Sequence, residues 1–427
     1  MSAVREWSRL DNAAKIFPPT STKQDPKVFR FVCELNEAVD AQILQTALDR
    51  TVELFPFYRS VLKKGLFWYF FEDSPLKPTV EREWEEPCSP IYDPDKPGLL
   101  FRVTYYRRRI NLEVFHALAD GVGAVHFLRM LVYHYLMEKH QTCIAGELQP
   151  DDREPSLDQI SQDAFRKYYD REKKIRLQKR VRAYRIRGAR LPDNRAGFIE
   201  GVMPVSAVLP LAHETHSTLG EFLTALLLCA IGDSMDTRDR NCPAVIAVPV
   251  DLRHYFPTHT ARNFFGLIHV SHSFRKLGDG FPDVLENVRS SFEQQLKSEN
   301  MMEIINRYSA LENNTFVKAI PLALKIPCLK LAGWQAGHEE TAAVSNLGVV
   351  TMPPELSKYI HLFNVSIVTN RPQICMCTFG DNLTVSYTSH LKSTSLPCAF
   401  FRKLTDLNIP VEINSNLGQE EETHEHL

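Results

Sequence analysis

The feature that most constrains this chain is a short motif, His116-Ala117-Leu118-Ala119-Asp120-Gly121, between two elements of different type. Residues 101–106 and 110–115 are rich in β-forming side chains and flank a charged turn, which predicts a hairpin. Residues 122–139 carry apolar side chains at the spacing of one helix face. The motif therefore connects a strand to a helix, where an imidazole can be lifted off the end of a sheet.

The residues of this motif suit acid–base chemistry. A histidine can remove a proton from a hydroxyl near neutral pH, because its ordinary pKa lies close to that pH. Asp120 can accept hydrogen bonds from the turn or pair with an arginine, and Gly121 permits a backbone path that a side chain would block. We take His116, Asp120 and Gly121 as candidate catalytic residues. The alternative is a buried histidine on a structural turn, which a short motif does not exclude.

The motif resembles the H-x-x-x-D-G signature of the chloramphenicol acetyltransferase-like superfamily, which includes peptide-synthetase condensation domains, BAHD acyltransferases and alcohol O-acetyltransferases. Further segments resemble motifs of this group in the same order: residues 10–18, 55–60, 249–253, 262–265 and 345–348. Phe115 stands where a second histidine is often found, and the D-F-G-W-G motif of the plant branch is absent. The chain is thus most similar to bacterial alcohol O-acetyltransferase-like and condensation-domain-like proteins.

This resemblance implies an α/β fold of two chloramphenicol acetyltransferase-like domains, with mixed sheets flanked by helices and an active-site tunnel at the domain interface. We expect residues 1–190 to form the N-terminal domain with the motif and residues 191–417 to form the C-terminal domain. Residues 418–427 are expected to be a disordered acidic tail. The length of 427 residues favours two domains over one.

The resemblance also assigns supporting residues. It implies that Asp120 serves geometry through a salt bridge, with Arg59 as first candidate and Arg253 as second. It places Asn263, Ser345, Asn346 and Gly348 along the tunnel, and the first three are candidate donors to an oxyanion. A turn-forming or capping role is an equally good interpretation of these polar residues.

The function that follows is acyl transfer from a thioester donor, an acyl-CoA such as acetyl-CoA, to an alcohol hydroxyl. His116 is the general base and no covalent enzyme intermediate forms, since the sequence lacks a G-x-S-x-G nucleophile elbow. Two alternatives stay open. One is a condensation-type amide- or ester-forming enzyme that uses an acyl carrier protein, and the other is a non-catalytic binding or assembly protein on the same fold.

Other site classes find little support. The spacing in His213-Glu214-Thr215-His216 does not fit H-E-x-x-H, and Cys375-Met376-Cys377 has no second pair at zinc spacing, so we expect no metal. Phosphate-loop and dinucleotide-binding motifs are absent, and we expect no bound cofactor.

Composition bounds the partners and the compartment. A net charge of -2 argues against nucleic-acid binding. Nine cysteines without a signal peptide, and no apolar run long enough to span a bilayer, favour a cytoplasmic protein. Residues 165–190 hold twelve Lys or Arg against two acidic residues. This stretch either steers a phosphate-bearing donor or forms a solvated linker, and the linker is the favoured interpretation.

Periodicity predicts further elements. A helix over 41–55 begins after Asp40, ends before Pro56 and is followed by a hairpin over 59–71. Thr218 is expected to cap another helix. Further strands are expected at 28–35, 197–204, 244–250, 342–350, 363–368, 374–379 and 383–387, and further helices at 207–215, 283–297, 301–313, 316–331 and 397–407.

Overall fold

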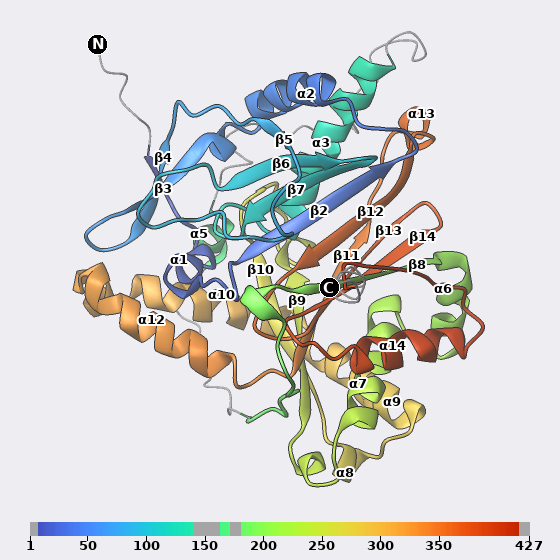
Figure 1. The fold of residues 1–427 in the computed structure, drawn as a ribbon. Coiled ribbons are helices and arrows are strands. Elements are labelled where there is room, and N and C mark those ends of the chain that lie inside the picture. Colours follow the sequence, from blue (N-terminus) through green and yellow to red (C-terminus); the bar gives the residue numbers. More distant parts are fainter. Residues whose placement is uncertain (1–6, 141–162, 171–180, 418–427) are drawn as a thin grey trace, which may run out of the picture.

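The structure is a computed structural model that describes residues 7–140, 163–170 and 181–417. The predicted loop at 141–157, residues 171–180 of the basic stretch and the acidic tail lie outside the described residues. Figure 1 shows a mixed α/β architecture in which strands run through the centre and helices lie outside them. The predicted fold class of mixed sheets flanked by helices is confirmed.

A five-stranded sheet carries the motif hairpin. Its strand order is β12-β2-β7-β6-β5, and the strands span Ile360–Ile367, Val28–Leu35, Arg109–Phe115, Phe101–Tyr106 and Val80–Arg82. The predicted hairpin is β6 and β7, which pair antiparallel. β7 lies between β2 and β6 and is buried along most of its length, so its last residue, Phe115, is fixed inside the sheet.

Two helices pack against each other beside this sheet, α2 (Ala41–Leu54) and α3 (Gly121–Lys139). Asp40 caps α2 as predicted, because its carboxylate accepts hydrogen bonds from the backbone N–H groups of Gln42 and Ile43. The buried side chains of both helices join those of the sheet in one apolar core. The motif thus lies between two rigid elements, the five-stranded sheet and α3.

A second, seven-stranded sheet has the order β10-β9-β11-β13-β14-β8-β15. Helix α7 (Leu219–Ser234) begins after Thr218, which forms a capping box with Glu221, so the predicted cap is confirmed. The strands span Phe265–His272, Ala244–Asp251, Ala342–Val349, Gln373–Phe379, Asn382–Ser389, Gly197–Pro204 and Glu412–Ser415, and the helices beside them are α7 (Leu219–Ser234), α9 (Phe281–Gln295) and α14 (Ser395–Thr405). β10 and β15 were not among the predicted strands.

Strand β12 crosses between the two halves of the chain. It comes from the C-terminal half but pairs antiparallel with β2, with Val365 opposite Phe31. β13 also serves both halves, because alternate residues of a strand face opposite sides. Cys375 and Cys377 join the first core, and Met376 joins the second. The division at residue 190 therefore does not separate the sheets and stays a prediction.

The remaining elements flank the two large sheets. A three-stranded sheet, β1-β4-β3, contains the predicted hairpin (Trp7–Arg9, Tyr69–Asp73 and Ser60–Lys64). The single helix predicted at 316–331 was wrong. The structure has α11 (Thr315–Ala319) and α12 (Leu322–Ala336), separated at Pro321, which has no N–H to donate and restricts the residue before it. Other helices are α1 (Phe17–Thr20), α5 (Ala164–Tyr168), α6 (Val205–Glu214), α8 (Phe274–Leu277), α10 (Ser298–Asn313) and α13 (Pro354–Ser357).

Within the described ranges, no single helix has the length and apolar character needed to cross a membrane. Only α6 and α7 taken together pass that test, across a bend of 85°.

Candidate active site

His116 follows β7 directly, and its backbone is anchored to the neighbouring strand. Its N–H donates a hydrogen bond of 2.7 Å to the carbonyl oxygen of Lys27, the residue that precedes β2. Lys27 has a φ of 58°, in the left-handed region, so the chain turns at this point before it enters β2. The backbone of His116 is thus fixed from two strands before its side chain makes any contact.

Aromatic rings surround the imidazole. Phe17 of α1 stacks on it, with ring centroids 4.1 Å apart and an interplanar angle of 16°. Phe265 of β10 is 5.2 Å away at 26°, and Phe29 of β2 is 4.3 Å away and tilted by 60°. The side chain is 8% exposed, and its Nδ1 has no hydrogen-bond partner among the described residues. Burial lowers the pKa of His116 to about 4, so the imidazole is neutral at pH 7.

Asp120 lies in a network of hydrogen-bond donors at the start of α3. Its Oδ1 accepts a hydrogen bond of 3.0 Å from the Gly123 N–H, which makes it the N-cap of the helix. Its Oδ2 accepts one of 2.8 Å from the Phe264 N–H. Arg253 donates to both carboxylate oxygens, at 2.9 and 3.2 Å. Asp120 therefore joins the helix that follows the motif to a segment from the other half of the chain.

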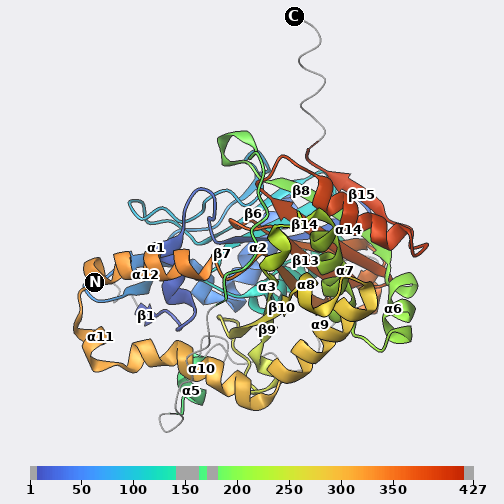
Figure 2. The same cartoon turned by 90° about the horizontal axis from the view of Figure 1, so that it is seen from below.

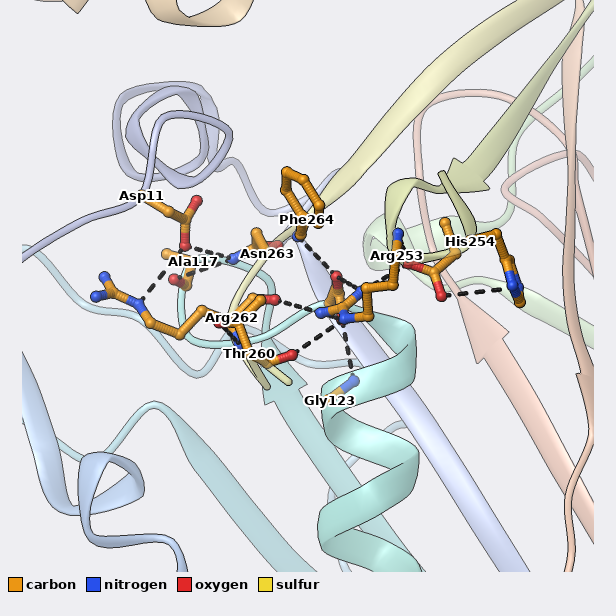
Figure 3. A network of polar contacts seen from close by, with 11 residues as sticks. Asp11, Ala117, Gly123, Arg253, His254, Thr260, Arg262, Asn263 and Phe264 are labelled. Atoms are coloured by element: carbon orange, nitrogen blue, oxygen red, sulfur yellow. Dashed lines mark hydrogen bonds and ion pairs between the residues drawn. The ribbon is translucent and has the colours of Figure 1, made fainter. Parts of the chain in front are cut away.

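Arg253 is itself held by backbone carbonyl groups, as Figure 3 shows. It donates to the carbonyl oxygens of Thr260 and Arg262, at 3.0 and 2.7 Å, and to the Asp251 carboxylate at 2.9 Å. Burial opposes its charge, but the carboxylates of Asp120 and Asp251 outweigh that effect and raise its pKa. The guanidinium stays charged and immobile.

The first candidate for this ion pair, Arg59, was wrong. Arg59 ends the short helix η2 (Pro56–Arg59) at an exposed position, and the second candidate, Arg253, makes the pair. The reason is geometric. Asp120 faces the segment at 253–264 of the second half, whereas Arg59 leads into the small sheet through β3.

Glycines allow the close approach of that second-half segment to α3. A Cβ on Gly123 would lie 1.9 Å from the carbonyl oxygen of Ala261, a distance that no side chain can accept. A Cβ on Gly121 would lie 2.7 Å from a methyl group of Leu347 in β11. Gly121 was predicted as part of the site. Gly123 was not, although the sequence Gly-Val-Gly at a helix start is a visible signal of close packing.

Asn263 lies at the centre of a second buried contact. Its Nδ2 donates to the Asp11 carboxylate at 3.2 Å and to the Ala117 carbonyl oxygen at 3.4 Å. Both donors are thus used within the protein, and Asn263 ties the motif turn to the N-terminal segment. Its amide hydrogens point at these two oxygens, which supports the structural interpretation, and its role as an oxyanion donor stays a prediction.

Asp11 was missed as a site residue, although its segment was part of the resemblance. It is fully buried, and its Oδ1 accepts a hydrogen bond of 2.7 Å from the Ala14 N–H at the start of the turn that leads to Phe17. Burial raises the pKa of Asp11 to about 6, although the nearby Arg262 acts in the opposite direction. A carboxylate within the mostly apolar run at 10–17 was the available signal.

The three candidates on β11 point in two directions. Ser345 pairs in register with Cys375 and Asn346 with Met376, so the two side chains lie on opposite faces of the strand. Leu347 packs against the core that includes Cys375, the partner of Ser345, and it also contacts Gly121. Asn346 faces α7 and its Oδ1 accepts a hydrogen bond from the Gly348 N–H, a turn-forming role. Gly348 has a φ of 74°, which explains the glycine there.

A cavity of about 370 Å³ opens beside the N-terminus of α3. Both halves of the chain line it, including Gly123, His126, Arg253 and Leu347. His116 is not among the lining residues, so the predicted tunnel stays a prediction. Among the described residues no group of three or more His, Cys, Asp or Glu is arranged to hold a metal ion.

No protein-family model matches the sequence, and no curated protein matches it. Solved structures do match it over most of its length. TRI3 trichothecene 15-O-acetyltransferase from Fusarium sporotrichioides is similar with a TM-score of 0.60, 8% identity and 94% of each chain covered. F. graminearum TRI101, complexed with coenzyme A and deoxynivalenol, gives 0.61 and 12%, over 95% of this chain and 97% of that one. The first condensation domain of the CDA synthetase gives 0.60 and 16%, over 95% and 97%.

The chain has the chloramphenicol acetyltransferase-like fold. The predicted resemblance is therefore confirmed at the level of architecture. At these identities the likeness concerns the chloramphenicol acetyltransferase-like fold alone, so the reaction has to be argued from His116 and the residues around it.

Proposed function

We propose that this protein transfers an acyl group from acyl-coenzyme A, such as acetyl-CoA, to the hydroxyl of a small alcohol. The observation that carries the proposal is the state of His116. Its imidazole is neutral at pH 7 and sits on a rigid strand-to-helix junction. Asp120 is engaged with Arg253 and two backbone N–H groups, which leaves His116 as the proton acceptor of the motif.

The proposed reaction is a direct displacement. A ring nitrogen of His116 accepts the hydroxyl proton while the alcohol oxygen bonds to the thioester carbonyl carbon, and the carbonyl electrons move to its oxygen. When the carbonyl re-forms, the C–S bond breaks, and the thiolate takes the proton from the imidazolium. The histidine is regenerated and no enzyme-bound acyl group is needed.

The oxyanion of the tetrahedral intermediate requires a hydrogen-bond donor. Of the predicted donors, Ser345 fits best, because it lies on the β11 face that meets the motif turn. Its hydroxyl makes no side-chain hydrogen bond in the part of the chain that the structure describes. Asn263 and Asn346 have structural roles instead.

Thiol release from acetyl-CoA and longer acyl-CoA donors, measured with a panel of alcohols, tests the proposal. We expect alcohol-dependent release by the wild type and a loss of about 10²–10⁴ in rate for His116→Ala. His213→Ala, an exposed histidine at the end of α6, is the matched control and is expected to keep full activity. Equal rates for wild type and His116→Ala would contradict the role of His116.

The same assay separates the alternatives. Turnover only with an acyl group on a carrier protein would favour the condensation-type reaction. Donor binding without release of thiol from any thioester would favour a binding protein. Both kinds of donor should be measured, because the fold is similar to that of acetyltransferases and to that of a condensation domain.

A further inference from the structure

A large share of the exposed apolar side chains is gathered around helix α12. On the helix, Leu324, Leu331 and Trp334 are 65%, 56% and 64% exposed. Their spacing of seven and three residues places them on one side of the helix. We call the α12 face this helix side together with the exposed apolar residues that adjoin it, namely Trp7, Leu66, Phe67 and Ile320.

The segments of the α12 face are in direct contact with one another. The Leu322 N–H donates to the Leu66 carbonyl oxygen at 2.8 Å. Lys325 donates to the Phe67 carbonyl oxygen at 3.1 Å and lies 3.8 Å from the Trp68 ring centroid. These bonds fasten the β3–β4 turn, with its exposed Leu66 and Phe67, to the N-terminal end of α12.

A cavity of about 590 Å³ adjoins this surface, and Trp7 and Phe67 belong to both. Five aromatic side chains and three cations line it with one carboxylate, the residues being Trp7, Arg9, Lys15, Phe67, Trp68, Tyr69, Phe70, Glu72 and Lys318. Figures 1 and 2 both place α12 at the edge of the molecule beside α1. α1 carries Phe17, which stacks on His116, so the α12 face lies over one wall of the candidate active site.

The charged side chains of α12 and of the segment just before it all have one sign. From residue 314 to residue 336 the sequence contains three lysines and no Asp or Glu. Lys318 and Lys330 are exposed and flank the apolar side chains, and Arg9 adds a further exposed cation. Such a surface combines apolar side chains, a tryptophan and lysines, and the one carboxylate that lines the adjoining cavity is Glu72.

These features distinguish between two kinds of partner. Protein interfaces are depleted in lysine relative to the rest of the protein surface. Helices that lie in a membrane interface place Leu and Trp in the acyl boundary and Lys at the headgroups. We propose that the protein docks on an anionic phospholipid surface through the α12 face. The proposal concerns a surface and does not rest on acyl transfer.

Sedimentation with lipid vesicles tests it, using the full chain and no acyl donor or acceptor. We expect the wild type to bind phosphatidylcholine–phosphatidylglycerol vesicles and to bind pure phosphatidylcholine vesicles much more weakly. The triple variant Leu324→Gln, Leu331→Gln, Trp334→Gln is expected to bind about tenfold more weakly or worse, because its apolar contacts are removed. Lys318→Gln and Lys330→Gln are each expected to weaken binding to the anionic vesicles about fivefold, and this effect should shrink in high salt.

Matched variants outside the α12 face control for general surface effects. Trp84→Gln and Leu407→Gln remove exposed apolar side chains, and Lys276→Gln and Lys392→Gln remove exposed charges; all four are expected to bind as the wild type does. Thermal unfolding confirms that each variant folds. Equal binding to both vesicle types, or equal binding by the triple variant, would overturn the proposal. The proposal would also be overturned if light scattering showed a wild-type dimer that the triple variant does not form, while neither protein binds vesicles.

Discussion

Arg253 and Asp120, 133 positions apart in sequence, form a two-point ion pair in which each guanidinium Nη donates to one carboxylate oxygen. Both side chains are largely buried, at 12% and 5% exposure. The pair joins the N-terminus of the motif helix α3 to the segment that enters β10. It therefore fixes the direction in which the chain leaves His116, and this relationship defines the first prediction.

Arg253→Met is expected to destabilise the protein by about 3–5 kcal/mol, because it leaves the Asp120 carboxylate buried without its partner. Urea unfolding measures the change. Arg59→Met is the matched control, since Arg59 is exposed and makes no contact with Asp120, and it is expected to change the free energy of unfolding by less than about 0.5 kcal/mol. Similar losses for both variants would show that the pair has no special role.

The glycines at the start of α3 are expected to differ sharply in tolerance. Gly123→Ala forces a Cβ against the Ala261 carbonyl, which is backbone and cannot rotate away, so we expect a loss of about 3 kcal/mol or more together with most of the activity. Gly121→Ala meets a leucine methyl group that can move, and its effect should be smaller. Gly98→Ala, with open space around it, serves as the control. Urea unfolding measures these losses of stability. A larger loss for Gly121→Ala than for Gly123→Ala would refute the packing argument.

The pH dependence of turnover should report the buried state of His116. Its pKa of about 4 lies below the ordinary value of 6.5, so the acid limb of kcat/KM is expected near pH 4 and not near 6.5. Stability follows the same sign. The unfolded chain binds a proton at this histidine below pH 6.5, whereas the folded chain does not until about pH 4. The contribution of His116 to the free energy of unfolding is therefore full above pH 6.5 and is lost as the pH falls toward 4.

His126 has a pKa lowered to about 4 by burial and by the nearby Arg129, so it contributes to stability with the same sign. The rate profile separates the two histidines, because His126→Gln should leave the acid limb in place. An acid limb near pH 6.5 in the wild type would contradict a buried, neutral His116.

Asp11 is expected to act with the opposite sign. Its pKa of about 6 lies above the ordinary 3.8, so the folded chain holds the proton more tightly, and this group costs stability as the pH rises from about 4 to 6. Relative to the wild type, Asp11→Asn should therefore gain up to about 3 kcal/mol over that range. Urea unfolding of both proteins across the range measures the difference. A constant difference would indicate that Asp11 is not the titrating group.

Turnover gives a second readout for the role of Asp11. Because its carboxylate holds Ala14 and Asn263, we expect Asp11→Asn to lower kcat through the position of Phe17 and the motif turn. Asp406→Asn, which removes an exposed carboxylate after α14, controls for the loss of one negative charge. Unchanged kcat in Asp11→Asn would limit the role of Asp11 to stability.

The sequence by itself determined the local features of this protein. Asp40 and Thr218 cap their helices because capping requires only a side-chain oxygen and the next few N–H groups. The strand, turn and helix around His116 follow from periodicity over about thirty residues. The prediction of one helix at 316–331 failed at Pro321. Proline is a local signal for a break, but the prediction gave more weight to the apolar spacing on both sides of it.

Tertiary structure alone decided which arginine meets Asp120, which rings enclose His116 and where β12 pairs. Arg59 and Arg253 both lie in segments that resemble the same superfamily, and nothing in either segment encodes a distance to Asp120. Phe17, Phe29 and Phe265 reach the imidazole from three separate elements. These contacts join residues that are remote in the chain, and they exist only because the two sheets and their helices bury a common core, which no local pattern of side chains specifies.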